Sequence, residues 1–184
     1  MKKIVEATTS TDAIFLYETI NNVKPGGLNN APDLDLNSPE SKKRLLKDDI
    51  SLYEVFKIAS EYDSICFEWV NNYPITIDLA YPYLMEQLQT RDLNKAIVHT
   101  FLKVLSSYPD TLISRKVGKK ISIEISLKAN ELMVLGGLET RAGQRGLMEF
   151  DKKLRENGNQ LNPGTTADLI AATLGFCVLS GYRP

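Results

Sequence analysis

The stretch "KKISIEISLKANELMVLGG", residues 119–137, decides the fold class, because it fits two kinds of secondary structure. Its front, "ISIEIS", alternates apolar and polar residues, as a strand with one buried face does. Over the longer window, the apolar residues recur at helical spacing: Ile121, Ile125, Ala129, Leu132 and Met133. Gly136 and Gly137 then supply a helix stop. Since no second strand signal occurs nearby, the sequence predicts a helix here.

The segments on either side of this stretch also have a helical period. Residues 91–108, "RDLNKAIVHTFLKVLSSY", place their apolar side chains in one stripe, and residues 11–23 follow Ser10, a residue type that caps helices. Pro82 interrupts residues 75–89 and predicts a kinked or broken helix. The sequence therefore predicts an all-α fold, with residues 1–184 in a single bundle-like domain of about seven helices.

Residues 28–49, "LNNAPDLDLNSPESKKRLLKDD", break this pattern. They are rich in Asn, Asp, Ser and Pro and show no apolar period. We interpret them as a long polar loop, and long loops in compact domains are often functional.

The charge balance and the rare residues exclude several function classes. The chain has 22 basic and 23 acidic side chains, so nothing favours nucleic acid or an anionic membrane as a partner. We find no membrane-spanning run and no signal peptide, and a cytoplasmic location is expected. Cys66 and Cys177 lack the spacing of a metal site or a disulfide framework, and His99 is the sole histidine. A zinc site or a histidine-based nucleophile relay is therefore not expected.

The last helix, in "NPGTTADLIAATLGFCVLSG" (residues 162–181), is apolar on nearly every face, which predicts a central and buried position. Its start carries one acid, Asp168. In one interpretation Thr165 caps the helix and Asp168 completes a capping-box-like pair. In the other, the free N–H groups and hydroxyls of this start bind a phosphate, and the carboxylate binds a phosphate-bound Mg²⁺.

Other residues are candidates for ligand binding, and each also has a simple structural explanation. Gly26 and Gly27 in "KPGGLNN" would let the backbone approach a ligand, or they end a helix. Arg115 and Lys116 in "PDTLISRKVGKK" could hold a di- or triphosphate, or they form a solvated helix end. Arg155, near a helix end, could cap carbonyls or face the same pocket.

Asp63 and Glu68 in "SEYDSICFEW" are the remaining acidic candidates. On a regular helix they would lie about 140° apart, so they do not form a carboxylate pair on one face. Each could still line a site separately.

In their order along the chain, four motifs resemble the triphosphoribosyl-dephospho-CoA synthase family, in particular its archaeal-type branch: "ATTSTDAIFLYETINNVKPGGL", "EYDSICFEW", "PDTLISRKVG" and "LRENGNQLNPGTTADLIAA". The resemblance runs from about Val5 to Ser180, and "NPGTTADLIAA" is its most specific part. It implies an all-α cytoplasmic transferase that moves the triphosphoribosyl part of ATP onto a ribose hydroxyl of 3′-dephospho-CoA and releases adenine, with Mg²⁺ bound to the triphosphate.

The resemblance also implies residue roles. Asp168 would face Mg²⁺ or the ribose, and Asp63 and Glu68 are further catalytic candidates. The residues expected to bind substrate are Arg115, Lys116, Thr165, Thr166, Gly26, Gly27, Asn162 and Arg155.

The chain departs from the family pattern at its front, where longer members carry a Pro-Lys-Pro-Gly-Asn-type segment and a His-bearing segment. A natural short form, a split-gene subunit and a trimmed chain all fit this difference. One interpretation is a transferase, acting as a homo-oligomer or with a partner chain that supplies the front. The alternative is a non-catalytic helical subunit for nucleotide binding or assembly, with an apolar face left open on the last helix.

Overall fold

The computed structural model describes residues 2–24 and 31–183 of the chain. These residues form eleven α-helices, one π-helix and one 3₁₀-helix, and no strand. The all-α prediction is confirmed, with more helices than expected, and residues 119–134 are helical throughout. The chain divides into two compact units, Met1–Tyr73 and Pro74–Pro184, where the sequence predicted one domain. Each unit is described by itself.

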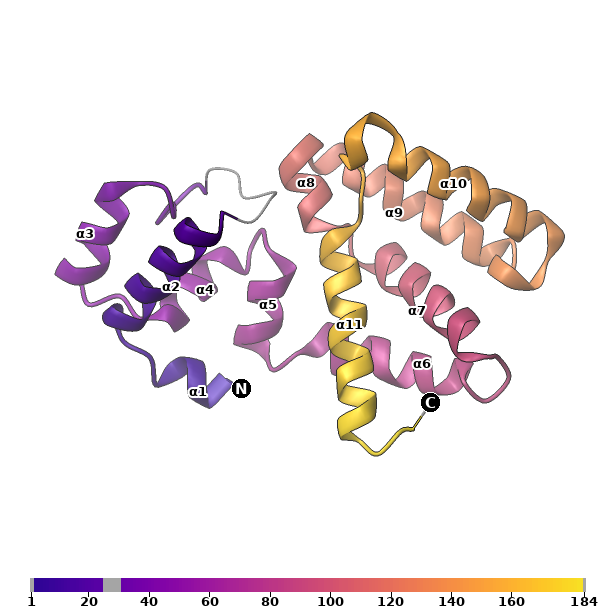
Figure 1. Ribbon diagram of the computed structural model, residues 1–184, viewed down its shortest axis with the longest axis horizontal. Coiled ribbons are helices and arrows are strands. Elements are labelled where there is room, and N and C mark those ends of the chain that lie inside the picture. Colours follow the sequence, from indigo (N-terminus) through magenta and orange to yellow (C-terminus); the bar gives the residue numbers. More distant parts are fainter. Residues whose placement is uncertain (1, 25–30, 184) are drawn as a thin grey trace. The chain divides into compact units, whose positions relative to one another are not determined.

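The N-terminal unit packs five helices (Figure 1): α1 (Lys2–Glu6), α2 (Ser10–Val23), α3 (Pro39–Lys47), α4 (Leu52–Ala59) and α5 (Ser64–Asn71). Its core contains Ala13, Tyr17, Leu34, Leu45 and Val55. The Tyr17 hydroxyl donates a 2.6 Å hydrogen bond to the Leu34 carbonyl, and burial raises the pKa of this hydroxyl. This bond fastens the segment before α3 to α2.

Helix α3 lies inside residues 28–49, where the sequence analysis predicted a loop. Its start signals were present, because Ser38 occupies the N-cap position and Pro39 the first turn. The helix buries only Ser41 and Leu45, so its apolar period is too short to recognise. Short helices of this kind are held by tertiary packing more than by their own pattern.

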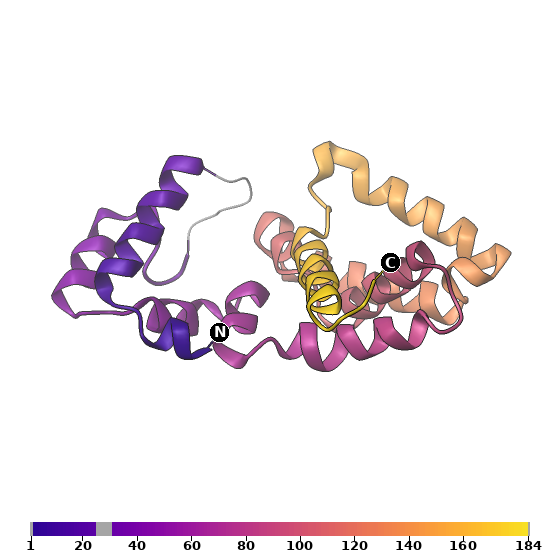
Figure 2. The ribbon, with the colours of Figure 1, turned by 60° about the horizontal axis from the view of Figure 1, so that its bottom comes forward.

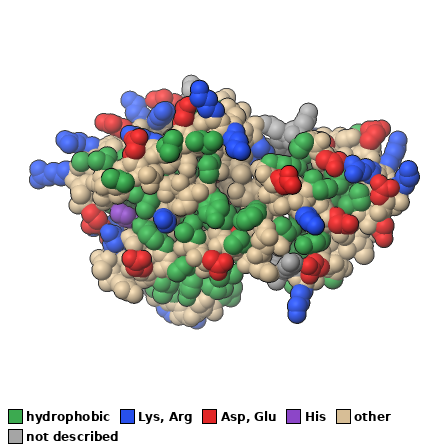
Figure 3. Space-filling view, turned by 180° about the vertical axis from the view of Figure 1, so that it is seen from behind, with side chains coloured by type: hydrophobic (Ala, Val, Ile, Leu, Met, Phe, Trp, Pro, Cys, Tyr) green, Lys and Arg blue, Asp and Glu red, His purple; other side chains and the backbone are tan. Residues whose placement is uncertain are grey.

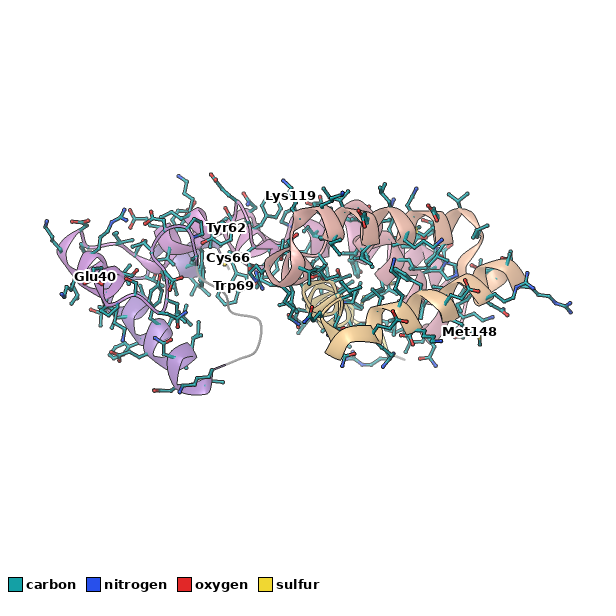
Figure 4. All side chains as sticks on the ribbon, turned by 90° about the horizontal axis from the view of Figure 1, so that it is seen from above. Glu40, Tyr62, Cys66, Trp69, Lys119 and Met148 are labelled. Carbon is teal, nitrogen blue, oxygen red and sulfur yellow. The ribbon has the colours of Figure 1, made fainter. Side chains whose placement is uncertain are left out.

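The contact between α4 and α5 includes an edge-to-face pair of Phe56 and Trp69, whose ring centroids are 5.2 Å apart. Figure 4 labels Trp69 together with Tyr62 and Cys66 in this part of the unit. Aromatic pairs of this geometry stabilise a core beyond the apolar area they bury.

The C-terminal unit contains the remaining elements (Figures 1 and 2): η1, a π-helix (Pro74–Ala80), α6 (Tyr81–Gln87), α7 (Leu93–Ser107), α8 (Thr111–Val117), α9 (Lys119–Val134), η2, a 3₁₀-helix (Gly137–Glu139), α10 (Arg141–Asn159) and α11 (Gly164–Leu179). Near Pro82, where the sequence predicted a kinked or broken helix, the π-helix η1 ends at Ala80 and α6 follows directly, with Pro82 in its first turn. The α7–α9 contact is the most extensive, and the main core consists of Leu102, Leu105, Ile113, Ile125, Ala129, Leu132, Phe150 and Leu154.

Helix α11 packs on η1, α6, α7 and α8. It buries one side, formed by Thr165, Thr166, Leu169, Ile170, Thr173 and Cys177. The other side is exposed and includes Ala167, Asp168, Ala171, Gly175 and Val178. The apolar sequence had suggested a helix that is buried all round. The structure buries it along one side only.

None of the described helices is long and apolar enough to cross a membrane. On the face seen in Figure 3, basic and acidic side chains are interspersed. This mixed distribution agrees with the balanced charge of the sequence.

His99 is a buried residue of α7 that packs against η2. A Cβ atom added to Gly137 would lie 2.6 Å from the imidazole Cε1, so the ring sits directly on the backbone of η2. The Leu138 N–H donates to Nε2 at 3.4 Å, which requires that this nitrogen carry no proton. His99 therefore joins α7 to η2 through its ring.

We expect His99 to make the stability of the fold depend on pH. Burial lowers its pKa below the ordinary value, Arg91 and Lys95 add to this effect, and Glu139 opposes it. Because the unfolded chain binds the proton more tightly, the full stability is present above the unfolded pKa of about 6.5 and is lost as the pH falls through it. Urea unfolding at pH 5.5 and 7.5 measures this loss. In His99→Gln, the free energies of unfolding at the two pH values should differ by less than in the wild type. An unchanged difference would mean that other groups cause the pH dependence.

Candidate active site at the starts of α8 and α11

Asp110 is a buried carboxylate, 2% exposed, at which two helices begin. Its Oδ1 accepts hydrogen bonds from the N–H groups of Leu112 (2.9 Å) and Ile113 (3.1 Å) and so caps α8. Its Oδ2 accepts bonds from the Thr166 N–H (2.7 Å) and the Thr166 hydroxyl (2.8 Å), in the first turn of α11. One side chain thus serves two helix starts, where a negative charge is favourable.

Three hydroxyls strengthen the same junction. The Thr165 Oγ1 accepts bonds from the Leu112 N–H and from the Thr111 hydroxyl, both at 3.1 Å. The Ser122 hydroxyl of α9 donates to the Asp110 carbonyl at 2.7 Å. Three helices are therefore joined around Asp110 by buried polar contacts, which have little freedom to shift.

Gly164 allows α8 and α11 to approach. A Cβ atom at this position would lie 2.5 Å from Leu112 Cδ2, closer than any ordinary contact. Gly164 therefore lies against the Leu112 side chain, and the motifs "PDTLISRK" and "NPGTTADL" lie against each other in the folded unit.

The sequence alone assigns no role to Asp110. A cap for α8 could have been found, because an Asp before an apolar turn is a common start signal. The bonds to Thr166 join residues 56 positions apart and follow only from the tertiary fold.

Arg115 and Lys116 lie in the last turn of α8. Arg115 is half-buried, whereas Lys116 is exposed. The Asp110 junction therefore fixes the helix that carries both predicted phosphate-binding cations.

Asp168 lies on the exposed side of α11, one turn beyond the helix start. The prediction that Thr165 caps the last helix is wrong, because α11 begins at Gly164 and Pro163 occupies the N-cap position. Thr165 and Thr166 are buried inside the first turn, and their hydroxyls bond to α8. Asn162 is exposed, and its carbonyl accepts from the Gly164 N–H at 2.8 Å.

The other acidic candidates belong to the N-terminal unit. Asp63 is the N-cap of α5, and its Oδ1 accepts from the N–H groups of Ile65 (2.8 Å) and Cys66 (3.1 Å). Glu68 is a buried residue of the same helix, 1% exposed. Gly26 and Gly27 lie outside the described residues.

Arg155 lies on the exposed surface of α10. Its Nε bonds to Asp151 at 2.8 Å, and this bond raises the pKa of the guanidinium. The pair is a local one along a single helix.

Across residues 2–24 and 31–183, no group of three or more His, Cys, Asp or Glu side chains could hold a metal ion. A Mg²⁺ ion that arrives with a nucleotide needs less, because it is usually bound by one or two carboxylates together with phosphates and water. The exposed Asp168 fits that mode of binding.

Comparison with known proteins places these features in a family. Residues 1–183 match the family model described as CitG, ATP:dephospho-CoA triphosphoribosyl transferase. The chain is also similar to a crystal structure from Archaeoglobus fulgidus, described as a proposed triphosphoribosyl-dephospho-CoA synthase, with 25% identity and a TM-score of 0.76. The match covers 99% of this chain and 69% of that chain. The chain therefore belongs to the ATP:dephospho-CoA triphosphoribosyl transferase family.

Proposed function

We propose that the protein transfers the triphosphoribosyl group of ATP to a ribose hydroxyl of 3′-dephospho-CoA and releases adenine. The observation that carries this proposal is the match of the family model to residues 1–183. It is supported by the junction of "PDTLISRK" with "NPGTTADL", which places two phosphate-binding candidates and one carboxylate candidate on helices that share Asp110.

Arg115 and Lys116 are assigned to the triphosphate. Two cations at the end of one short helix can balance the charge of the phosphates as the glycosidic bond breaks. Thr165 and Thr166 are assigned to the frame of the site, because their hydroxyls already bond to α8. Mg²⁺ bound with ATP would neutralise further phosphate charge, and Asp168 is the residue to hold it.

The transfer exchanges one bond for another. The bond between the ribose C1′ and the adenine nitrogen breaks, and a bond forms from C1′ to the acceptor oxygen. The proton of the acceptor hydroxyl leaves to a base, and adenine takes up a proton as it departs. Asp168, if it faces the ribose in place of Mg²⁺, would stabilise the positive charge on C1′ or accept that proton.

Adenine release from ATP and Mg²⁺, with and without 3′-dephospho-CoA, tests the proposal. We expect release that depends on dephospho-CoA and falls about 100-fold or more in Asp168→Ala, since groups that stabilise developing charge contribute effects of this size. Glu149→Ala is the matched control, because Glu149 is an exposed carboxylate of the same unit. Equal activity in the two variants would remove Asp168 from the site.

A second candidate function is favoured by the exposed side of α11, where Val178 and Leu179 are apolar and exposed. In this case the chain is one subunit of a split enzyme, or it is a non-catalytic helical subunit for nucleotide binding or assembly. It then acts as a homo-oligomer or together with a partner chain. The exposed side of α11 is the candidate contact face. Absence of adenine release from the wild-type chain alone would favour this function, and size measurement in solution would then separate self-association from the need for a partner.

A further inference from the structure

We propose that Asp110 is the positioning residue of the transferase site: its carboxylate holds α8, which carries Arg115 and Lys116, in register with the first turns of α11, which carry Asp168. This inference rests on the proposed function. Asp110 itself touches neither substrate nor metal in this account. It acts through the two helices that its oxygens connect.

The two carboxylate oxygens of Asp110 bond to different helices. Oδ1 faces α8 and binds the N–H groups of Leu112 and Ile113, and Oδ2 faces α11 and binds the N–H and hydroxyl of Thr166. An ordinary helix cap needs only the first set of bonds. The second set, across 56 residues of sequence, joins one helix start to the other, together with the bonds from Thr111 and Leu112 to Thr165.

The surroundings leave this link little room to adapt. Asp110 is 2% exposed and Thr166 is 1% exposed, so water cannot readily replace a lost bond. Gly164 brings α11 against the side chain of Leu112, so the helices are already at close contact. A change in the Asp110 link must therefore move α11 relative to α8, or leave a buried donor unsatisfied.

Such a movement would separate the cations from the carboxylate. Binding of the triphosphate by Arg115 and Lys116 depends on α8 alone, whereas stabilisation of the reacting ribose needs Asp168 on α11 at the right place. Misplacement of reacting groups by about 1 Å can cost about 100-fold in rate. Loss of the link should therefore lower kcat by a larger factor than it raises KM for ATP, because both cations stay on α8.

Asp110→Asn tests the link with almost no change in size. A carboxylate accepts bonds at both oxygens, whereas an amide accepts at one side and donates at the other. Whichever way the amide turns, one of the two helix starts faces an NH₂ group. We expect kcat for adenine release to fall about 10- to 100-fold, measured well below the unfolding temperature.

Two further variants separate positioning from general stability. Asp92→Asn alters an exposed cap of α7, which accepts from the Lys95 N–H at 3.0 Å, and should leave kcat unchanged. Thr166→Val removes only the hydroxyl bond to Oδ2. If the link acts through Thr166, Asp110→Asn combined with Thr166→Val should lose no more activity than Asp110→Asn alone.

The outcomes distinguish this inference from the proposed function. A drop in kcat confined to the Asp110 and Thr166 variants, with a non-additive double variant, supports the positioning role. An active wild type with an equally active Asp110→Asn overturns the positioning role and leaves the proposed function standing, and so does a KM effect without a kcat effect. A wild type that neither binds Mg-ATP nor releases adenine overturns both.

Discussion

Asp110→Ala should lower the free energy of unfolding of the C-terminal unit by about 2–4 kcal/mol, because two helix caps are lost together and each contributes about 1–2 kcal/mol. Four donors now bond to the carboxylate, on Leu112, Ile113 and Thr166. The Leu112 N–H would keep its bond to Thr165 Oγ1, whereas the donors of Ile113 and Thr166 would lose the Asp110 acceptor in a buried place. Unsatisfied buried donors are the costly part of such a change.

Thermal unfolding followed by circular dichroism measures this effect. A loss of 2–4 kcal/mol corresponds to a fall of roughly 4–16 °C for a chain of this size. Asp92→Ala is the control, because Asp92 caps α7 at the surface through one bond and should cost about 1 kcal/mol or less. If both variants cost the same, Asp110 serves one helix and not two.

Gly143→Ala should destabilise the start of α10 by about 3 kcal/mol, at the upper end of the usual cost of overpacking. A Cβ atom at Gly143 would lie 2.1 Å from the Gly137 carbonyl oxygen and 2.8 Å from the Gly137 nitrogen. Both atoms belong to the backbone, so the clash cannot be relieved by rotation of a side chain. The start of α10 would have to move away from η2.

Gly175→Ala is the matched control for this prediction. Gly175 is also a helical glycine, but nothing lies within 4 Å of the position of its added Cβ atom. Alanine in an open helical position should stabilise by about 0.5–1 kcal/mol. Denaturant unfolding of the two variants should therefore give shifts of opposite sign, and similar shifts would contradict the close approach of α10 and η2.

The sequence predicted the fold where the apolar period was long. Residues 119–134 were recognised as a helix because five apolar positions outweighed a short alternating segment, and the structure has a helix there. Helix α3 was not predicted, because it buries only two side chains. A helix was predicted over residues 75–89, but its π-helical front, η1, was not, because a π-helix has no simple pattern of its own.

The candidate site was predicted in part for a similar reason. Local chemistry pointed to "NPGTT" and "PDTLISRK", and the structure brings these two motifs together. The sequence could not show that Thr165 and Thr166 bond to α8, because these bonds depend on which segments meet in the folded unit. The same limit concealed Asp110, whose second set of partners lies 56 residues away.

The span between Asp110 and Thr166 has a consequence for synthesis on the ribosome. Residues 1–73 form a compact unit whose contacts are complete before the second unit has been made. The Asp110 carboxylate, by contrast, obtains its Thr166 partner only after a further 56 residues have left the exit tunnel. Until then the nascent second unit carries an acidic group at an incomplete interface, so the junction of α8 with α11 closes late in the folding of this unit.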